Sequence, residues 1–296
     1  MRLNTLVKRA CDKRRFNSVE DYADFCLYYL EYIKHNLQAV IVCRNENKYQ
    51  FFQYNKEGTF NVTRPVNGEI MLCLESFEES RKNFKELIAN IKDNEAKKES
   101  NRKLINNYIY TCQQSIGAAL DALPVGKSNT ARKINGDLFE RFIRLIISDI
   151  GIEVGDGTIS VPIKIDGKVA FNMKYQHDLI IKVEDDVRAI GSVKTSSKDR
   201  IDKIFIDKFL YNKLTDNYTP HFAIFLNDVQ RKGKEGKYGI GSTFLPGHFK
   251  GYTIKLNPLD GVYYIDIRPN MLTEDILKSQ IKTFDHFILT DIWKFV

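Results

Sequence analysis

Residues 178–194 pair an acid with a lysine across a predicted β-hairpin, because two apolar runs there flank an acidic turn. A turn centred on Asp186 would place Asp178 directly opposite Lys194, and Ser192 opposite Ile180. Side chains alternate along a strand, so Asp178, Ser192 and Lys194 would share one face of the sheet. The sequence therefore predicts a carboxylate beside an ammonium at the open end of a hairpin.

The predicted helices on either side of this hairpin supply further acids. After the hairpin, Arg200, Lys203 and Asp207 have the i, i+3, i+7 spacing of one helix face. Before it, Glu140 lies on a predicted amphipathic helix. Two or three carboxylates with one lysine suit metal-dependent phosphodiester hydrolysis, because carboxylate oxygens bind Mg²⁺ and the metal activates water. The lysine can stabilise the developing oxyanion or orient the attacking water.

These residues resemble the PD-(D/E)XK nuclease signature, with a serine where the middle acid usually stands. Type II restriction endonucleases that recognise CCGG or CCNGG cores share this change, and in them a carboxylate 13 residues after the lysine replaces the acid. That position is Asp207 here, although the family usually has Glu. VKTSSKDR resembles the group's K-T-x-x-[KR]-[DE]-R segment, and NTARKINGDLFERF resembles the segment that supplies a first glutamate, Glu140. The resemblance covers about residues 127–227.

The resemblance implies a site-specific endonuclease that hydrolyses double-stranded DNA with Mg²⁺. Asp178, Asp207 and Glu140 would bind the metal, and Lys194 would assist the water and the oxyanion. Ser192 would leave room for Asp207. A homodimer is implied because a symmetric site presents two antiparallel strands to cut. A DNA methyltransferase would be the functional partner.

Basic residues near these segments are the candidate DNA contacts. The family segment implies contacts to base edges, and arginine bound to guanine is the commonest specific base contact. The basic, glycine-rich loop 230–241 suits either a plain surface loop or a DNA-contacting loop. The candidate DNA-binding residues are Lys198, Asp199, Arg200, Lys203, Arg132, Lys133, Arg231, Lys232 and Lys234.

The elements that must position these residues alternate between helix and strand. In the first third, the sequence predicts a helix that begins after Ser18, two strands around an Asn-Glu-Asn turn, and a charged helix or helix pair. The almost wholly polar stretch 92–103 is a candidate linker or solvated connector. Later patterns predict strands at 158–165 and 168–175, the acidic hairpin, a helix at 198–214, a strand at 221–226, a strand pair around Asp260-Gly261, and a helix at about 273–294.

This order predicts an α/β fold, with a restriction-endonuclease-like core whose mixed central sheet is flanked by helices. We expect a smaller N-terminal α+β domain at residues 1–100 and the catalytic domain at residues 101–296. The N-terminal domain could contact DNA, bind an effector or dimerise, and the sequence favours none of these.

The composition fits a cytoplasmic DNA-acting enzyme. The 296 residues carry a net charge of +7, which permits a nucleic-acid partner without establishing one. The five cysteines form no CxxC pair, which indicates reduced thiols and argues against a zinc site. We expect no secretory signal and no membrane span, because no uncharged apolar run reaches about 18 residues.

Other interpretations stay open. Asp207 could form a surface i,i+4 ion pair with Lys203, and Glu140 could do the same with Arg144. The protein could be a structure-specific or repair nuclease of the same fold, or an inactive DNA-binding protein with a degenerate nuclease core.

Overall fold

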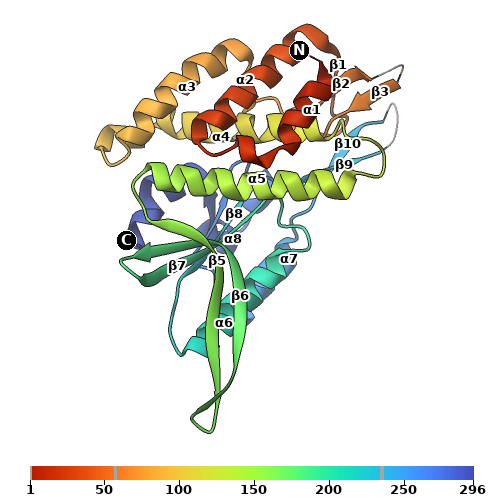
Figure 1. Cartoon of the computed structure of the whole chain (residues 1–296). Coiled ribbons are helices and arrows are strands. Elements are labelled where there is room, and N and C mark those ends of the chain that lie inside the picture. Colours follow the sequence, from red (N-terminus) through yellow and green to blue (C-terminus); the bar gives the residue numbers. More distant parts are fainter. Residues whose placement is uncertain (1, 57–58, 234–236) are drawn as a thin grey trace. The chain divides into compact units, whose positions relative to one another are not determined.

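The computed structural model describes residues 2–56, 59–233 and 237–296 (Figure 1). The chain forms two compact units, one of Met1–Ile146 with Asp228–Thr243 and one of Ile147–Asn227 with Phe244–Val296. These bounds differ from the expected division at residue 100. The helix that begins there, α4, packs with α1, α2 and α3 inside the first unit.

The first unit combines helices with two small sheets. Strands β1, β2 and β3 follow one another in the larger sheet, and β4 pairs with the other end of β2. Strands β9 and β10, from the predicted basic loop, form a separate hairpin. The elements are α1 (Leu3–Cys11), α2 (Val19–Asn36), β1 (Leu37–Val42), β2 (Tyr49–Lys56), β3 (Thr59–Val62), β4 (Val66–Asn67), α3 (Leu74–Ala89), α4 (Glu99–Leu120), α5 (Ser128–Asp149, whose last turn enters the second unit), β9 (Val229–Lys232) and β10 (Gly239–Ser242).

Local signals explain several of these elements. The α2 helix begins with a capping box, in which Ser18 Oγ accepts from the Asp21 backbone N–H while the Asp21 carboxylate accepts from the Ser18 N–H. The polar stretch 92–103, predicted to be a linker or a solvated connector, is a connector between α3 and the start of α4 within this unit. The prediction of a helix pair in this region is confirmed by α3 and α4.

The second unit is built on a six-stranded mixed sheet of order β12-β11-β8-β7-β6-β5. β5, β6 and β7 pair antiparallel, and β7, β8, β11 and β12 pair parallel. The bounds are β5 (Val154–Ile165), β6 (Lys168–Val183), β7 (Asp186–Lys194), α6 (Ile201–Thr215), β8 (His221–Phe225), α7 (Pro246–Lys255), β11 (Gly261–Tyr264), α8 (Asp275–Gln280), β12 (Ile281–Thr283) and α9 (Phe284–His286), with a π turn and a 3₁₀ turn after it.

Helices cover both faces of this sheet. On one face, Ile204 and Phe205 of α6 and Phe249 of α7 share a buried core with Phe225 of β8. On the opposite face, Phe222 stacks near rings of the C-terminal helical segment. The mixed α/β fold with helices flanking a central sheet is therefore confirmed.

Three sequence-based expectations about the second unit are wrong in detail. The runs at 168–175 and 178–183 form one continuous strand, β6, whose distal half extends with β5 beyond the rest of the sheet (Figure 1). The expected strand pair around Asp260-Gly261 is a helix, α7, followed by the single strand β11, because Pro246 favours the first turn of a helix. The expected C-terminal helix is interrupted by β12, which extends the sheet beside β11.

No helix within residues 2–56, 59–233 and 237–296 is long and apolar enough to cross a membrane.

Candidate active site

The acid and the lysine of the hairpin lie in direct contact. Lys194 Nζ is 2.5 Å from Asp178 Oδ2, and both side chains are largely shielded, with 28% and 18% of their surfaces exposed. The same carboxylate oxygen accepts the Val193 backbone N–H at 2.9 Å. The paired residues of β6 and β7 end at Leu179 and Gly191, so Asp178 supplies an acceptor just where the strands stop pairing.

The register that produces this contact differs from the predicted one. The turn is the two-residue loop at 184–185, with Glu184 in the left-handed region at φ 55°, and not a turn centred on Asp186. Ile180 therefore pairs with Ile190 instead of Ser192. A shift of two positions leaves every side chain on its original face, because strands have a two-residue period. The predicted contact between Asp178 and Lys194 is therefore confirmed despite the wrong register.

Asp207 lies near the Asp178 end of the hairpin. Burial lowers the pKa of the His177 imidazole, while the carboxylates of Asp207 and Asp178 both act in the opposite direction on the same ring. Burial also raises the pKa of Tyr175, and Asp207 adds to that shift. Both acids therefore lie near one buried histidine.

The Asp207 carboxylate also forms the ion pair that the sequence left open, because Lys203 Nζ contacts it one turn earlier in α6. Lys203 is largely exposed, whereas Asp207 is about one-quarter exposed. The pair holds the Asp207 carboxylate beside Lys203 on the polar side of α6, while Ile204 and Phe205 of the same helix are buried in the core. Because Lys203 is largely exposed, a bound cation could replace it as the partner of the Asp207 carboxylate.

An aromatic cluster supports the acid-bearing strand. His177 is 7% exposed and makes ring contacts with Tyr175, Tyr211 and His221. These contacts make His177 a packing residue of this sheet. This cluster could not be predicted from the spacing of its residues, because β6, α6 and β8 each supply part of it.

A buried ion pair fixes the helix that carries Asp207. The next residue, Lys208, is 1% exposed in its side chain and lies 2.7 Å from Asp260 Oδ2. Its ammonium also donates to the Pro258 carbonyl at 2.6 Å. Asp260 in turn accepts the backbone N–H of His221 at 2.7 Å, so α6 is tied to both β8 and the loop before β11. Sequence reasoning missed Lys208 and Asp260, because 52 residues separate them.

The candidate base-reading residues form an exposed turn directly after the site. Lys198, Asp199 and Arg200 are exposed between β7 and α6, and Asp199 adopts the left-handed region at φ 55°. Ser192 is half-buried on β7, beside Ala223 of the parallel strand β8.

The remaining candidates belong to the first unit. Glu140 is half-buried on α5, and Arg132 and Lys133 are exposed near the start of that helix. Arg231 and Lys232 are exposed on β9, while Lys234 lies outside the described residues. Their roles, and the role of Glu140 as a third carboxylate, stay predictions.

The donor set of the second unit is compatible with Mg²⁺. Magnesium is commonly held by one or two carboxylates together with waters and substrate phosphates, and Asp178 and Asp207 offer two. Among the described residues, no group of three or more His, Cys, Asp or Glu side chains is arranged to hold a metal ion. In the second unit, Asp178 and Asp207 are the predicted ligands for such a metal, and Lys194 lies beside the first of them.

Comparisons with known proteins show the fold. No protein-family model and no curated protein matches the sequence. The crystal structure of the type IIP restriction endonuclease Kpn2I is similar with a TM-score of 0.70 and 19% identity, over 99% of this chain and 97% of that chain. The complex of the restriction endonuclease PspGI with substrate DNA gives a TM-score of 0.44 and 15% identity, over 78% of this chain and 93% of that chain. The mixed α/β fold of this chain is the fold of the restriction endonuclease Kpn2I.

Proposed function

We propose that this protein is a Mg²⁺-dependent type II restriction endonuclease that hydrolyses double-stranded DNA at specific sites. The observation that carries the proposal is the contact of Lys194 with Asp178 where β6 and β7 stop pairing. Asp207 lies near His177, the residue before Asp178. The similarity of the fold to that of the restriction endonuclease Kpn2I supports the proposal.

In this proposal each residue has a distinct task. Asp178 and Asp207 hold Mg²⁺, and Glu140 is the candidate third carboxylate. The bound metal would polarise the phosphoryl group and lower the pKa of a coordinated water. Lys194, held by Asp178 at 2.5 Å, keeps a positive charge at the site, where it can orient the attacking water or stabilise the oxyanion. Ser192 keeps its strand position free of a competing acid.

Specific recognition is assigned to the exposed turn after Lys194. Lys198, Asp199 and Arg200 can reach outward from this turn, because none is buried in the fold. The resemblance to CCGG-recognising enzymes makes a CCGG-like core the first sequence to test. A homodimer acting in the cytoplasm beside a DNA methyltransferase completes the proposal.

The direct test is cleavage of unmodified phage DNA with and without Mg²⁺. We expect discrete fragments from the wild type, and none from Asp178→Asn or Lys194→Ala. The matched controls are Asp185→Asn and Lys174→Ala, which change the same residue types at exposed positions elsewhere on the two hairpins. Both controls should cut like the wild type.

The outcomes separate the rival functions. Cutting only at forks or mismatches would favour a structure-specific nuclease. DNA binding without cleavage of any substrate would favour an inactive nuclease core. Cleavage that persists in both site variants would overturn the proposed site, and fragments that lack a CCGG-like end would remove that recognition core.

A further inference from the structure

The basic loop after β8 is an excursion that folds with the N-terminal unit. Asp228–Thr243 is part of the first unit, although the chain on both sides of it belongs to the second. Its two ends are tied together, because Thr243 Oγ1 donates to Asp228 Oδ1 at 2.7 Å and the Thr243 N–H donates to the Asp228 carbonyl at 3.1 Å. The excursion is thus a closed hairpin with a fixed root.

One edge of this hairpin is attached to the end of β1. The side-chain amide of Asn45 donates to the Ile240 carbonyl and accepts from the Ile240 N–H, both at 2.9 Å, which imitates a strand pairing. The Arg44 N–H donates to the Tyr238 carbonyl at 2.9 Å. Beneath them, Ile240 is buried in a cluster with Tyr49 and other apolar residues of β1 and β2.

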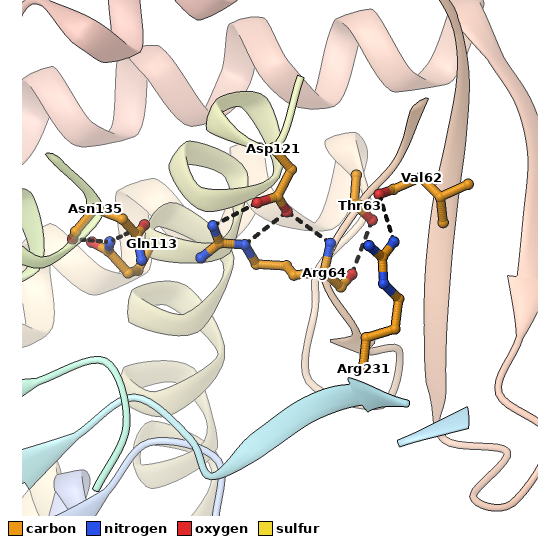
Figure 2. A network of polar contacts seen from close by, with 7 residues as sticks. All are labelled: Val62, Thr63, Arg64, Gln113, Asp121, Asn135 and Arg231. Carbon is orange, nitrogen blue, oxygen red and sulfur yellow. Dashed lines mark hydrogen bonds and ion pairs between the residues drawn. The ribbon is translucent and has the colours of Figure 1, made fainter. Parts of the chain in front are cut away.

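The other strand of the hairpin is attached through an arginine (Figure 2). Arg231 Nη1 donates to the Val62 carbonyl at 3.1 Å, at the end of β3. Two residues later, Arg64 binds the Asp121 carboxylate at the end of α4 through Nε at 2.9 Å and Nη2 at 2.8 Å. The hairpin is therefore hydrogen-bonded to the N-terminal sheet through both of its strands, and Arg231 supplies one of these bonds.

The outer face of the hairpin is basic. Because Ile240 is buried, its neighbours Gly239 and Gly241 lie on the opposite face, where both are half-buried against the side chains of Asn45 and Lys232. Lys232 lies over Gly241, since a Cβ there would be 2.3 Å from the lysine Cε and 2.8 Å from its Nζ. Because Gly241 has no side chain, the Lys232 side chain can lie against the backbone there, with its ammonium close to the hairpin surface.

Two more cations lie at the rim of this face. Arg44 and Lys237 are exposed and adjacent through the Arg44–Tyr238 backbone bond. Among the described residues, no carboxylate lies within 4 Å of the basic groups of Arg44, Lys232 or Lys237. The acid of the neighbouring turn, Glu46, is already 3.5 Å from Lys48. We call the three exposed residues Arg44, Lys232 and Lys237 the basic hairpin face.

We propose that the basic hairpin face binds backbone phosphates of double-stranded DNA, which makes the N-terminal unit a DNA-contacting module. This inference rests on the proposed endonuclease function. Lysine and arginine side chains neutralise phosphates, and such contacts position a protein on DNA without reading its sequence. Within the described part of the chain the face offers three cations and no acid, so it is suited to a polyanion.

The test measures binding to a fluorescent 30-base-pair duplex of random sequence in EDTA, which prevents cleavage, from about 50 to 200 mM salt. The variant is the triple change Arg44→Ala, Lys232→Ala, Lys237→Ala. The charge-matched control is Lys8→Ala, Lys82→Ala, Lys97→Ala, which removes three exposed lysines elsewhere in the same unit. A second control, Arg44→Lys with Lys232→Arg and Lys237→Arg, keeps the charges. Thermal unfolding verifies that all four proteins fold.

We expect the test variant to bind about ten- to a hundredfold more weakly, and its salt slope to fall by about 2.7, or about 0.9 for each lost phosphate contact. Both controls should keep the wild-type slope. If the test variant binds like the charge-matched control while the wild type binds and cuts DNA, this inference is overturned and the proposed function stands. If the wild type binds no duplex, both fail. If it binds through this face but never cuts DNA, the proposed activity alone fails.

Discussion

At the residue scale, the two acids of the candidate site differ in the partners that hold them. Asp178 accepts from Lys194 and from the Val193 backbone, and Asp207 accepts from Lys203. The first pair is shielded and ties two strands, whereas the second is a solvated pair within one helix turn. Exposed i,i+4 pairs contribute under about 0.5 kcal/mol, so stability alone is a weak reason for Asp207.

Substitution of Asp207 separates a metal ligand from a surface ion pair. We expect Asp207→Asn to reduce Mg²⁺-dependent cleavage by about a hundredfold or more, because the amide removes a charged oxygen ligand. Asp207→Glu should retain part of the activity. Asp202→Asn is the control, since Asp202 is exposed on the first turn of the same helix. Wild-type cleavage by Asp207→Asn would leave Asp207 with only the structural role.

At the element scale, buried ion pairs hold the helices that carry or frame the sites. Lys208 anchors α6 through Asp260, so the helix cannot rotate its Asp207 stripe without breaking that contact. In the first unit, Arg64 joins the end of β3 to Asp121 after α4 (Figure 2). The Arg64 guanidinium fits against α4 because residue 117 of that helix is a glycine. A Cβ on Gly117 would be 2.3 Å from Arg64 Nη1.

Two helical glycines should therefore respond in opposite directions to alanine. Gly117→Ala should lower the free energy of unfolding by about 1–3 kcal/mol, because the new methyl group displaces the buried Arg64. Gly136→Ala on α5 meets nothing within 4 Å, so better helix propensity should raise it by up to about 1 kcal/mol. Urea unfolding of both variants checks the pair. Equal effects of the two substitutions would show that Arg64 is not held in this way.

At the scale of the whole molecule, stability should depend on buried histidines. Burial lowers the pKa of His221 to about 4, and its Nδ1 lies 2.8 Å from the Thr219 carbonyl. His221 Nε2 is buried and has no hydrogen-bond partner among the described residues. Burial also lowers the pKa of His177 in the same cluster.

The folded protein should lose stability as the pH falls from about 6.5 to about 4. In that window the unfolded chain takes up a proton on His221 while the folded chain does not, which lowers the free energy of unfolding by up to about 3 kcal/mol. His221→Asn keeps an amide that can donate to Thr219 but cannot titrate. Urea unfolding at pH 7.5 and pH 5 should show a smaller difference for this variant than for the wild type. His248→Asn, at an exposed position, should match the wild type, and identical pH dependence in all three proteins would contradict the prediction.

The sequence by itself determined which side chains share a face and which helix follows them. Asp178, Ser192 and Lys194 stay on one face even though the hairpin register is shifted by two, because alternation along a strand is a local property of the backbone. The start of α2 after Ser18 was predictable for the same reason, since its capping box spans four residues.

Only the tertiary structure decided which distant segments pair. It placed the basic hairpin with the N-terminal sheet, turned part of the expected C-terminal helix into β12, and joined Lys208 to Asp260. No short-range pattern encodes these choices, because burial and hydrogen bonding between remote segments decide them. Periodicity and capping act over a few residues, whereas the partner of a strand or a buried charge is selected by the whole fold.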